Sequence, residues 1–138
     1  YFFVSATLQD IIRRYKKTHK KFDLFAARQA IQLNDTHPAI AIPELMRILV
    51  DVERLGWDAA WEVAVATFAY TNHTVLPEAL ESWPVAMLER LLPRHMQIIY
   101  AINAEVLAAA RDKLKVDDRH LGNISLINEE GGRRVRMG

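Results

Sequence analysis

Apolar side chains recur at helical spacing along most of the chain. This pattern predicts helices near residues 7–15, 43–53, 59–68, 84–92 and 94–114. The helix near residues 59–68 is apolar on most of its circumference, which is typical of a buried helix. The longest predicted helix is the last one, in which Ile98, Ile102 and Ala110 share a face.

Helix boundaries are indicated by capping and helix-breaking residues. These are Ser5 or Thr7 as the first cap, Gly56 as the end of the second helix, Asp58 as the third cap, Ser82 and Pro84 as the start of the fourth, and Pro93 as its break.

Two short apolar runs, residues 30–33 and 69–72, are expected to be strands. Each follows a helical segment and leads into a polar cluster, as in a parallel α/β sheet. Ligands bind beyond the carboxyl ends of such strands. We therefore expect residues 34–37 and 71–74 to lie on one rim, within a helix-rich α/β fold.

A β-hairpin is predicted at the C-terminal end. Residues 124–128 and 134–138 are short runs that flank Glu-Glu-Gly-Gly at residues 129–132. A two-stranded ribbon alone is marginally stable, so further strands of its sheet are expected elsewhere. Together with a first residue that is not methionine, this predicts that residues 1–138 form part of a domain from a longer protein.

The composition excludes several classes. The 138 residues are 51% hydrophobic and 25% charged, with a net charge of +1 and no cysteine. Disulfides and thiolate metal sites are excluded, and a reducing, cytoplasmic compartment fits. No apolar run approaches the roughly 20 residues of a membrane span. The basic residues between Arg13 and Arg28 are expected to form a solvated surface rather than a nucleic-acid site.

His73 is the first candidate for chemistry, because Asn72 and Thr74 flank it directly after a predicted strand. A neutral imidazole donates one hydrogen bond and accepts another, which suits a hydroxyl-rich ligand. The alternative is a histidine that satisfies backbone groups at the strand end.

Asp35 and His37 are the second candidates. They suggest an acid–histidine pair or two metal ligands, but a metal site would need a third ligand. The alternative is a polar turn in which Asp35 caps backbone groups.

Two further groups have structural as well as functional interpretations. Glu78 and Glu81 are a conceivable catalytic carboxylate pair, or acids that favour helix starts. The tryptophans are potential sugar-stacking platforms, but their spacing is more typical of packing; they are Trp57, Trp61 and Trp83.

Five stretches together resemble the glycogen and α-glucan (maltodextrin) phosphorylase family. They are ATLQDIIRR at residues 6–14, AIQLNDTHP at 30–38, AIPELMR at 41–47, AYTNHTVLPEALE at 69–81 and LLPRHMQIIY at 91–100. The resemblance covers nearly the whole chain. The segment at residues 20–29 is shorter than the corresponding segment of the animal enzymes.

The resemblance implies a central fragment from the late N-terminal domain, which is a doubly wound, glycosyltransferase-type (Rossmann-like) α/β domain. It implies reversible phosphorolysis of α-1,4-glucan by phosphate to glucose 1-phosphate, in an enzyme of the allosteric, homodimeric, cytoplasmic kind. The cofactor would be pyridoxal phosphate, whose lysine lies in a later domain that this chain lacks. The chain alone is then expected to be inactive.

The resemblance also assigns site residues. His73 matches the histidine whose ring bonds the glucosyl 6-hydroxyl and whose carbonyl faces the anomeric region. The glucosyl pocket is implied to be lined by Asp35, His37, Thr74, Ala79 and Glu81.

An alternative function is a non-enzymatic helical interaction module. Apolar faces around Trp57, Trp61 and Leu91 would be uncovered, and open strand edges would invite self-association.

Overall fold

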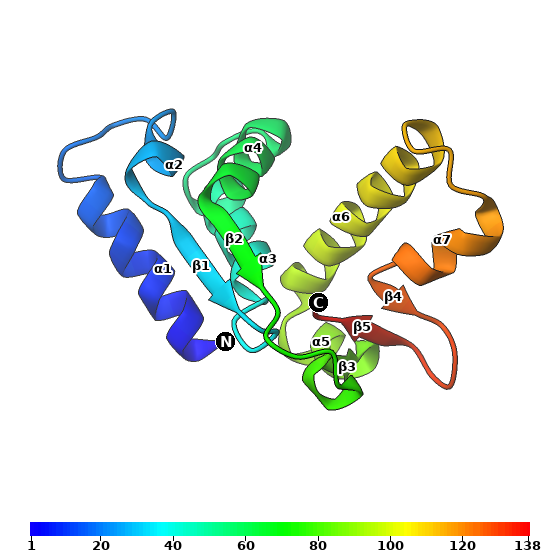
Figure 1. Cartoon of the computed structure of the whole chain (residues 1–138). Coiled ribbons are helices and arrows are strands. Elements are labelled where there is room, and N and C mark those ends of the chain that lie inside the picture. Colours follow the sequence, from blue (N-terminus) through cyan, green and yellow to red (C-terminus); the bar gives the residue numbers. More distant parts are fainter. The chain divides into compact units, whose positions relative to one another are not determined.

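The computed structural model describes the backbone of all 138 residues and every side chain except that of Glu78. Contacts divide the chain into two units (Figure 1). The first unit comprises Tyr1–Ala79 and Gly138, and the second comprises Leu80–Met137. The fold is helix-rich α/β, with a parallel sheet in the first unit and an antiparallel sheet in the second.

The first unit builds a parallel strand pair among helices. Its elements are α1 (Phe2–Tyr15), α2 (Phe25–Arg28), β1 (Ile31–Asn34), α3 (Ala41–Arg47), the π-helix η1 (Ile48–Val52), α4 (Trp57–Thr67), β2 (Phe68–Thr71) and the 3-10 helix η2 (Pro77–Ala79). Strands β1 and β2 lie side by side (Figure 1), in a register that runs from Ile31 opposite Phe68 to Asn34 opposite Thr71. The predicted parallel pairing is confirmed.

Large apolar side chains fill the centre of the first unit. Those with the least exposure include Phe25, Leu33, Leu45, Met46 and Leu49. An aromatic cluster of Tyr15, Phe22 and Phe25 adds to this core, with ring centroids 5.0 to 5.7 Å apart. Burial of this apolar surface is the main favourable term that holds the strands in place.

Helix α1 begins earlier than its capping residues predicted. It starts at Phe2, and neither Ser5 nor Thr7 is its cap. The Ser5 hydroxyl instead donates to Glu44 at 2.6 Å, and the Thr7 hydroxyl donates to the Phe3 carbonyl at 2.8 Å. Serine and threonine make such contacts inside helices as well as at their starts. For this reason the predicted start of α1 was wrong.

The boundary between the second and third helices also differs from the prediction. The helical segment ends in a π-turn at Val52, followed by Arg54 in the left-handed region (φ 63°). Gly56 caps the start of α4, and Asp58 lies in the first turn rather than at the cap. Gly56 therefore begins a helix instead of ending one.

Helix α4 is buried through its small side chains. Its buried residues are Ala60, Ala64 and Thr67, whereas Val65 is 59% exposed. The expectation that this apolar helix is buried on most of its circumference was therefore wrong, because only the face that carries the small side chains is buried.

The second unit packs helices on a three-stranded antiparallel sheet. Its elements are β3 (Ser82–Pro84), α5 (Val85–Leu91), α6 (Pro93–Asp112), α7 (Asp118–Ile124), β4 (Ile127–Asn128) and β5 (Arg134–Arg136). The strand order is β3-β5-β4. One core cluster joins the helices to the sheet; its buried members are Val85, Leu88, Met96, Ile99, Ile127 and Val135.

The predicted hairpin is confirmed, and a third strand extends it. Gly131 (φ 66°) and Gly132 (φ 105°) form the turn between β4 and β5. Residues Ser82–Pro84, predicted to start a helix, instead pair with β5. Proline is acceptable there because β3 is an edge strand.

Helix α7 was not predicted. The Asp117 side chain caps it by accepting the Arg119 N–H at 3.2 Å.

One fully buried carboxylate links α1 to α3. Glu44 is 0% exposed, and its oxygens accept hydrogen bonds from the Ser5 hydroxyl at 2.6 Å and from Arg47 Nε and Nη2 at 2.8 and 2.9 Å. The hydrogen bonds that Arg47 donates to Glu44 raise the pKa of the Arg47 guanidinium. A buried carboxylate is tolerated only when such partners replace its water.

Along the described part of the chain, none of the helices is both long enough and apolar enough to traverse a lipid bilayer.

We predict that Glu44→Gln destabilises the chain by about 3 kcal/mol, because it leaves the half-buried Arg47 guanidinium without its counter-charge. Urea unfolding monitored by circular dichroism measures the change. Asp10→Asn is the matched control, since Asp10 pairs with exposed Arg13 on the helix surface and its loss should change little. Equal stability of Glu44→Gln and the wild type would contradict the structural role of Glu44.

Candidate functional site

The parallel ladder ends at Asp35 in an unusual way. The Asp35 N–H donates to the Thr71 carbonyl at 2.8 Å, one position beyond the last paired residues. A continued parallel ladder would next bring the His73 N–H to the Asp35 carbonyl. The Asp35 backbone is instead left-handed (φ 55°), and its side-chain Oδ1 accepts the His73 N–H at 2.9 Å. The carboxylate therefore takes over the next position of the ladder.

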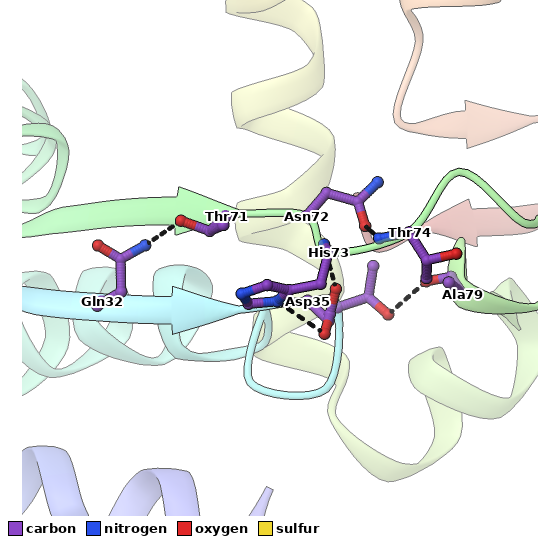
Figure 2. A network of polar contacts seen from close by, with 8 residues as sticks. Gln32, Asp35, Thr71, Asn72, His73, Thr74 and Ala79 are labelled. Carbon is purple, nitrogen blue, oxygen red and sulfur yellow. Dashed lines mark hydrogen bonds and ion pairs between the residues drawn. The ribbon is translucent and has the colours of Figure 1, made fainter.

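The same carboxylate also contacts the His73 ring. Asp35 Oδ2 lies 3.2 Å from His73 Nδ1 (Figure 2). The Asp35 side chain is 25% exposed and that of His73 is 54% exposed. One carboxylate thus holds the main chain and the ring of one histidine, while much of that ring stays accessible.

The electrostatics favour an ionised Asp35. The backbone hydrogen bond from His73 holds the pKa of the Asp35 carboxyl below its ordinary value, and partial burial opposes this effect. The His73 ring and electrostatic attraction to His37 lower the same pKa further. An ionised carboxylate can only accept hydrogen bonds, so both contacts to His73 are donated by the histidine.

The other polar residues at the end of β2 and in the loop after it also have hydrogen-bond partners. Thr71 Oγ1 accepts from Gln32 Nε2 at 2.7 Å, and Asn72 Oδ1 accepts the Thr74 N–H at 3.3 Å (Figure 2). Thr74 Oγ1 accepts the Leu76 N–H at 3.2 Å. The first contact joins β1 to β2, and the other two are ordinary turn chemistry. They give the loop after β2 a defined path around His73.

A buried threonine ties the two strand-end loops together. Thr36 is 1% exposed, and its hydroxyl donates to the Ala79 carbonyl at 3.3 Å. The sequence analysis did not single out Thr36 or Gln32. Thr36 could have been found from its position between the candidates Asp35 and His37, whereas no local signal marks Gln32.

The structure brings some of the predicted site residues together. Asp35 and His73 are in direct contact, and Thr74 and Ala79 follow His73 in the same unit, both partly buried. His37 is exposed two residues after Asp35, and the acid–histidine contact that the structure shows uses His73. Glu81 belongs to the second unit, where its carbonyl accepts the Met137 N–H at 3.0 Å.

The remaining candidates are weaker. The Glu78 side chain lies outside the described residues, so the Glu78–Glu81 pair stays a hypothesis. Among the residues whose side chains are described, no three His, Cys, Asp or Glu residues are grouped to hold a metal ion. Trp57 and Trp61 are half-buried, in keeping with packing, whereas Trp83 is 42% exposed.

A hollow of about 320 Å³ between α1 and the α3–η1 segment is a second possible site in the first unit. Its lining includes Arg13, Lys16 and Arg47, which pair with Asp10, Glu53 and Glu44 respectively. Because its cations are already neutralised, this hollow is a poorer candidate than the strand ends.

We predict that the Asp35 carboxyl titrates below its ordinary pKa, and that in His73→Ala its pKa stays lowered, though by less, because the backbone N–H of residue 73 remains. Carboxyl ¹³C NMR against pH measures both values. A depressed pKa in the folded chain means that Asp35 stabilises the fold above the pKa of the unfolded state, and that this contribution is lost as the pH falls through the folded value. An ordinary pKa in the wild type would contradict the contact.

Comparisons with known proteins identify the family of this chain. The chain matches the family described as "Carbohydrate phosphorylase" over residues 1–138. It is 57% identical to the liver form of glycogen phosphorylase from Bos taurus and to the muscle forms from Oryctolagus cuniculus and Homo sapiens. Each alignment covers 99% of this chain.

The aligned region is only part of each relative. The chain spans 17% of the length of these curated proteins. Since the family match extends over every residue from 1 to 138, the chain belongs to the carbohydrate phosphorylase family.

Proposed function

We propose that this chain forms part of the glucosyl pocket of an α-glucan phosphorylase. In this proposal, residues 1–138 are the late part of an N-terminal catalytic domain of the doubly wound, glycosyltransferase type. The parallel pair of β1 and β2, with polar side chains at its carboxyl end, supports that fold. The 57% identity to glycogen phosphorylases supports the activity.

The proposed reaction is the phosphorolysis of an α-1,4-glucan. Phosphate takes the terminal glucosyl unit as glucose 1-phosphate, the bond from the anomeric carbon to the glycosidic oxygen breaks, and that oxygen leaves as the 4-hydroxyl of the shortened chain. Positive charge develops at the anomeric carbon and ring oxygen in such reactions.

His73 has two roles in this proposal. Its main-chain carbonyl faces the anomeric region, where a fixed dipole stabilises developing positive charge. Its ring bonds the glucosyl 6-hydroxyl, and a sugar without that group would leave a polar ring atom unpaired. One observation carries the proposal: the Asp35 carboxylate contacts both the main-chain N–H and the ring of His73.

The other pocket residues surround these two groups. Asp35 and His37 would lie on the β side of the glucosyl ring, and the second wall would be formed by Thr74, Ala79 and Glu81. The protein would act as a cytoplasmic homodimer.

Pyridoxal phosphate would supply the acid–base group of the reaction through its 5′-phosphate. The lysines of this chain are exposed at helix ends and loops, which does not suit the enclosed lysine that holds this cofactor. Residues outside this chain would therefore bind it, and this chain would supply only contacts to the sugar.

We predict that His73→Ala in the phosphorylase that carries this chain lowers kcat/KM at least tenfold, or about 1.4 kcal/mol. Initial rates of glucose 1-phosphate formation measure the effect. His120→Ala is the control, because His120 lies on the exposed surface of α7. An unchanged kcat/KM for His73→Ala would contradict the assignment of His73 to the glucosyl pocket.

We also predict that the isolated chain is inactive, since neither the cofactor nor the phosphate-binding residues belong to it. Incubation with glycogen or maltodextrin and phosphate should give no glucose 1-phosphate above a blank. Release above the blank would show that the chain contains a complete site.

A further inference from the structure

We propose that Asp35 is a positioning residue for His73, fixing both its main chain and the protonation of its ring, rather than a direct ligand of the sugar. This role rests on the function proposed for His73 and deepens it. Asp35 is then not a residue that lines the pocket. It positions His73, which contacts the substrate.

The two carboxylate oxygens of Asp35 contact different groups of His73. Oδ1 accepts the main-chain N–H of His73 at 2.9 Å, and Oδ2 faces ring Nδ1 at 3.2 Å. Both bonds end on one residue that is 38 positions away in the sequence. Two bonds to one residue fix its peptide orientation and its ring rotation together. Each Asp35 oxygen is therefore already engaged with His73.

The backbone of Asp35 is shaped for this contact. Its left-handed φ of 55° turns its carbonyl out of the ladder and puts the side chain where that carbonyl would have been. A left-handed conformation is unfavourable for most residues, although aspartate and asparagine tolerate it. Such a conformation next to a candidate site is typical of a position that the surrounding structure determines.

The chemistry of the contact selects one ring tautomer. The carboxylate is an acceptor, so a neutral His73 must carry its proton on Nδ1 to complete the bond. Nε2 then keeps a lone pair that is not used by Asp35, on a side chain that is 54% exposed. The tautomer of a histidine is set in this way by the bond that its other nitrogen makes.

Asparagine at position 35 separates the two tasks. The main-chain N–H of His73 still requires an acceptor, so the amide oxygen should stay there and the NH₂ group should face Nδ1. A donor at that place demands a lone pair on Nδ1, so the ring proton moves to Nε2. Alanine at the same position removes both contacts.

Ring ¹⁵N NMR of the chain, recorded with the His73 ring in its neutral form, tests the contact directly. In the wild type we expect Nδ1 to be the protonated nitrogen, and in Asp35→Asn we expect Nε2 to be protonated. Asp10→Asn makes the same chemical change on an exposed helix face and should leave His73 unaltered. A wild-type ring protonated mainly on Nε2, or identical spectra for Asp35→Asn and the wild type, would overturn the proposal.

A double-mutant cycle in the phosphorylase that carries this chain tests how Asp35 acts. We expect Asp35→Asn to lower kcat/KM about fivefold in the wild type and less than about twofold in the His73→Ala background. Asp35→Ala should still lower kcat/KM in that background, because the main-chain anchor of residue 73 is lost as well. Equal effects of Asp35→Asn in both backgrounds would show that Asp35 contacts the sugar directly.

The two measurements separate this proposal from the proposed function. If the wild-type enzyme releases no glucose 1-phosphate, the function fails while the NMR result still decides the contact. If the enzyme is active and the tautomer does not depend on Asp35, only the positioning role fails.

Discussion

The parallel pairing of β1 and β2 is the constraint on which the candidate site depends. The four paired positions end with Asn34 opposite Thr71, and Asp35 is the first residue after Asn34 while His73 is the second residue after Thr71. A shift of the register by one residue would turn the side chains of either strand to the other face and separate this pair. The packing that holds the register therefore also holds the site, which explains why an exposed histidine can have a defined position.

That packing relies on a polar contact as well as on apolar burial. Glu44, on α3, joins Ser5 of α1 to Arg47 within the core of the first unit. Hydrophobic packing alone is non-directional, whereas the hydrogen bond from Ser5 to Glu44 joins the two helices in a defined geometry, and Arg47 supplies the other partners of the carboxylate from within α3. We infer that this contact fixes α1 against α3.

The sequence predicted the parts of the fold that follow from local pattern. Two short apolar runs ending in polar clusters indicated the parallel pair and a shared rim, and Glu-Glu-Gly-Gly indicated the hairpin. The strand at Ser82–Pro84 was missed because it exists only through pairing with β5, some fifty residues later. The burial of Glu44 was missed because no local pattern distinguishes a glutamate that meets Ser5 and Arg47 from a solvated one. At the site, the residue types were predictable, whereas the contact of Asp35 with His73 required the register.

The position of Asp35 makes three separate demands, and few side chains meet all of them. The backbone must be left-handed, which disfavours β-branched and bulky residues. The side chain must be short enough to reach the N–H and the ring nitrogen of the same histidine. Both of its terminal atoms must accept hydrogen bonds, whereas an asparagine amide has only one acceptor atom. Glutamate has two acceptor oxygens, but its longer chain would place them beyond the next position of the ladder. Aspartate is thus the residue that turns the end of a strand pair into a support for a histidine.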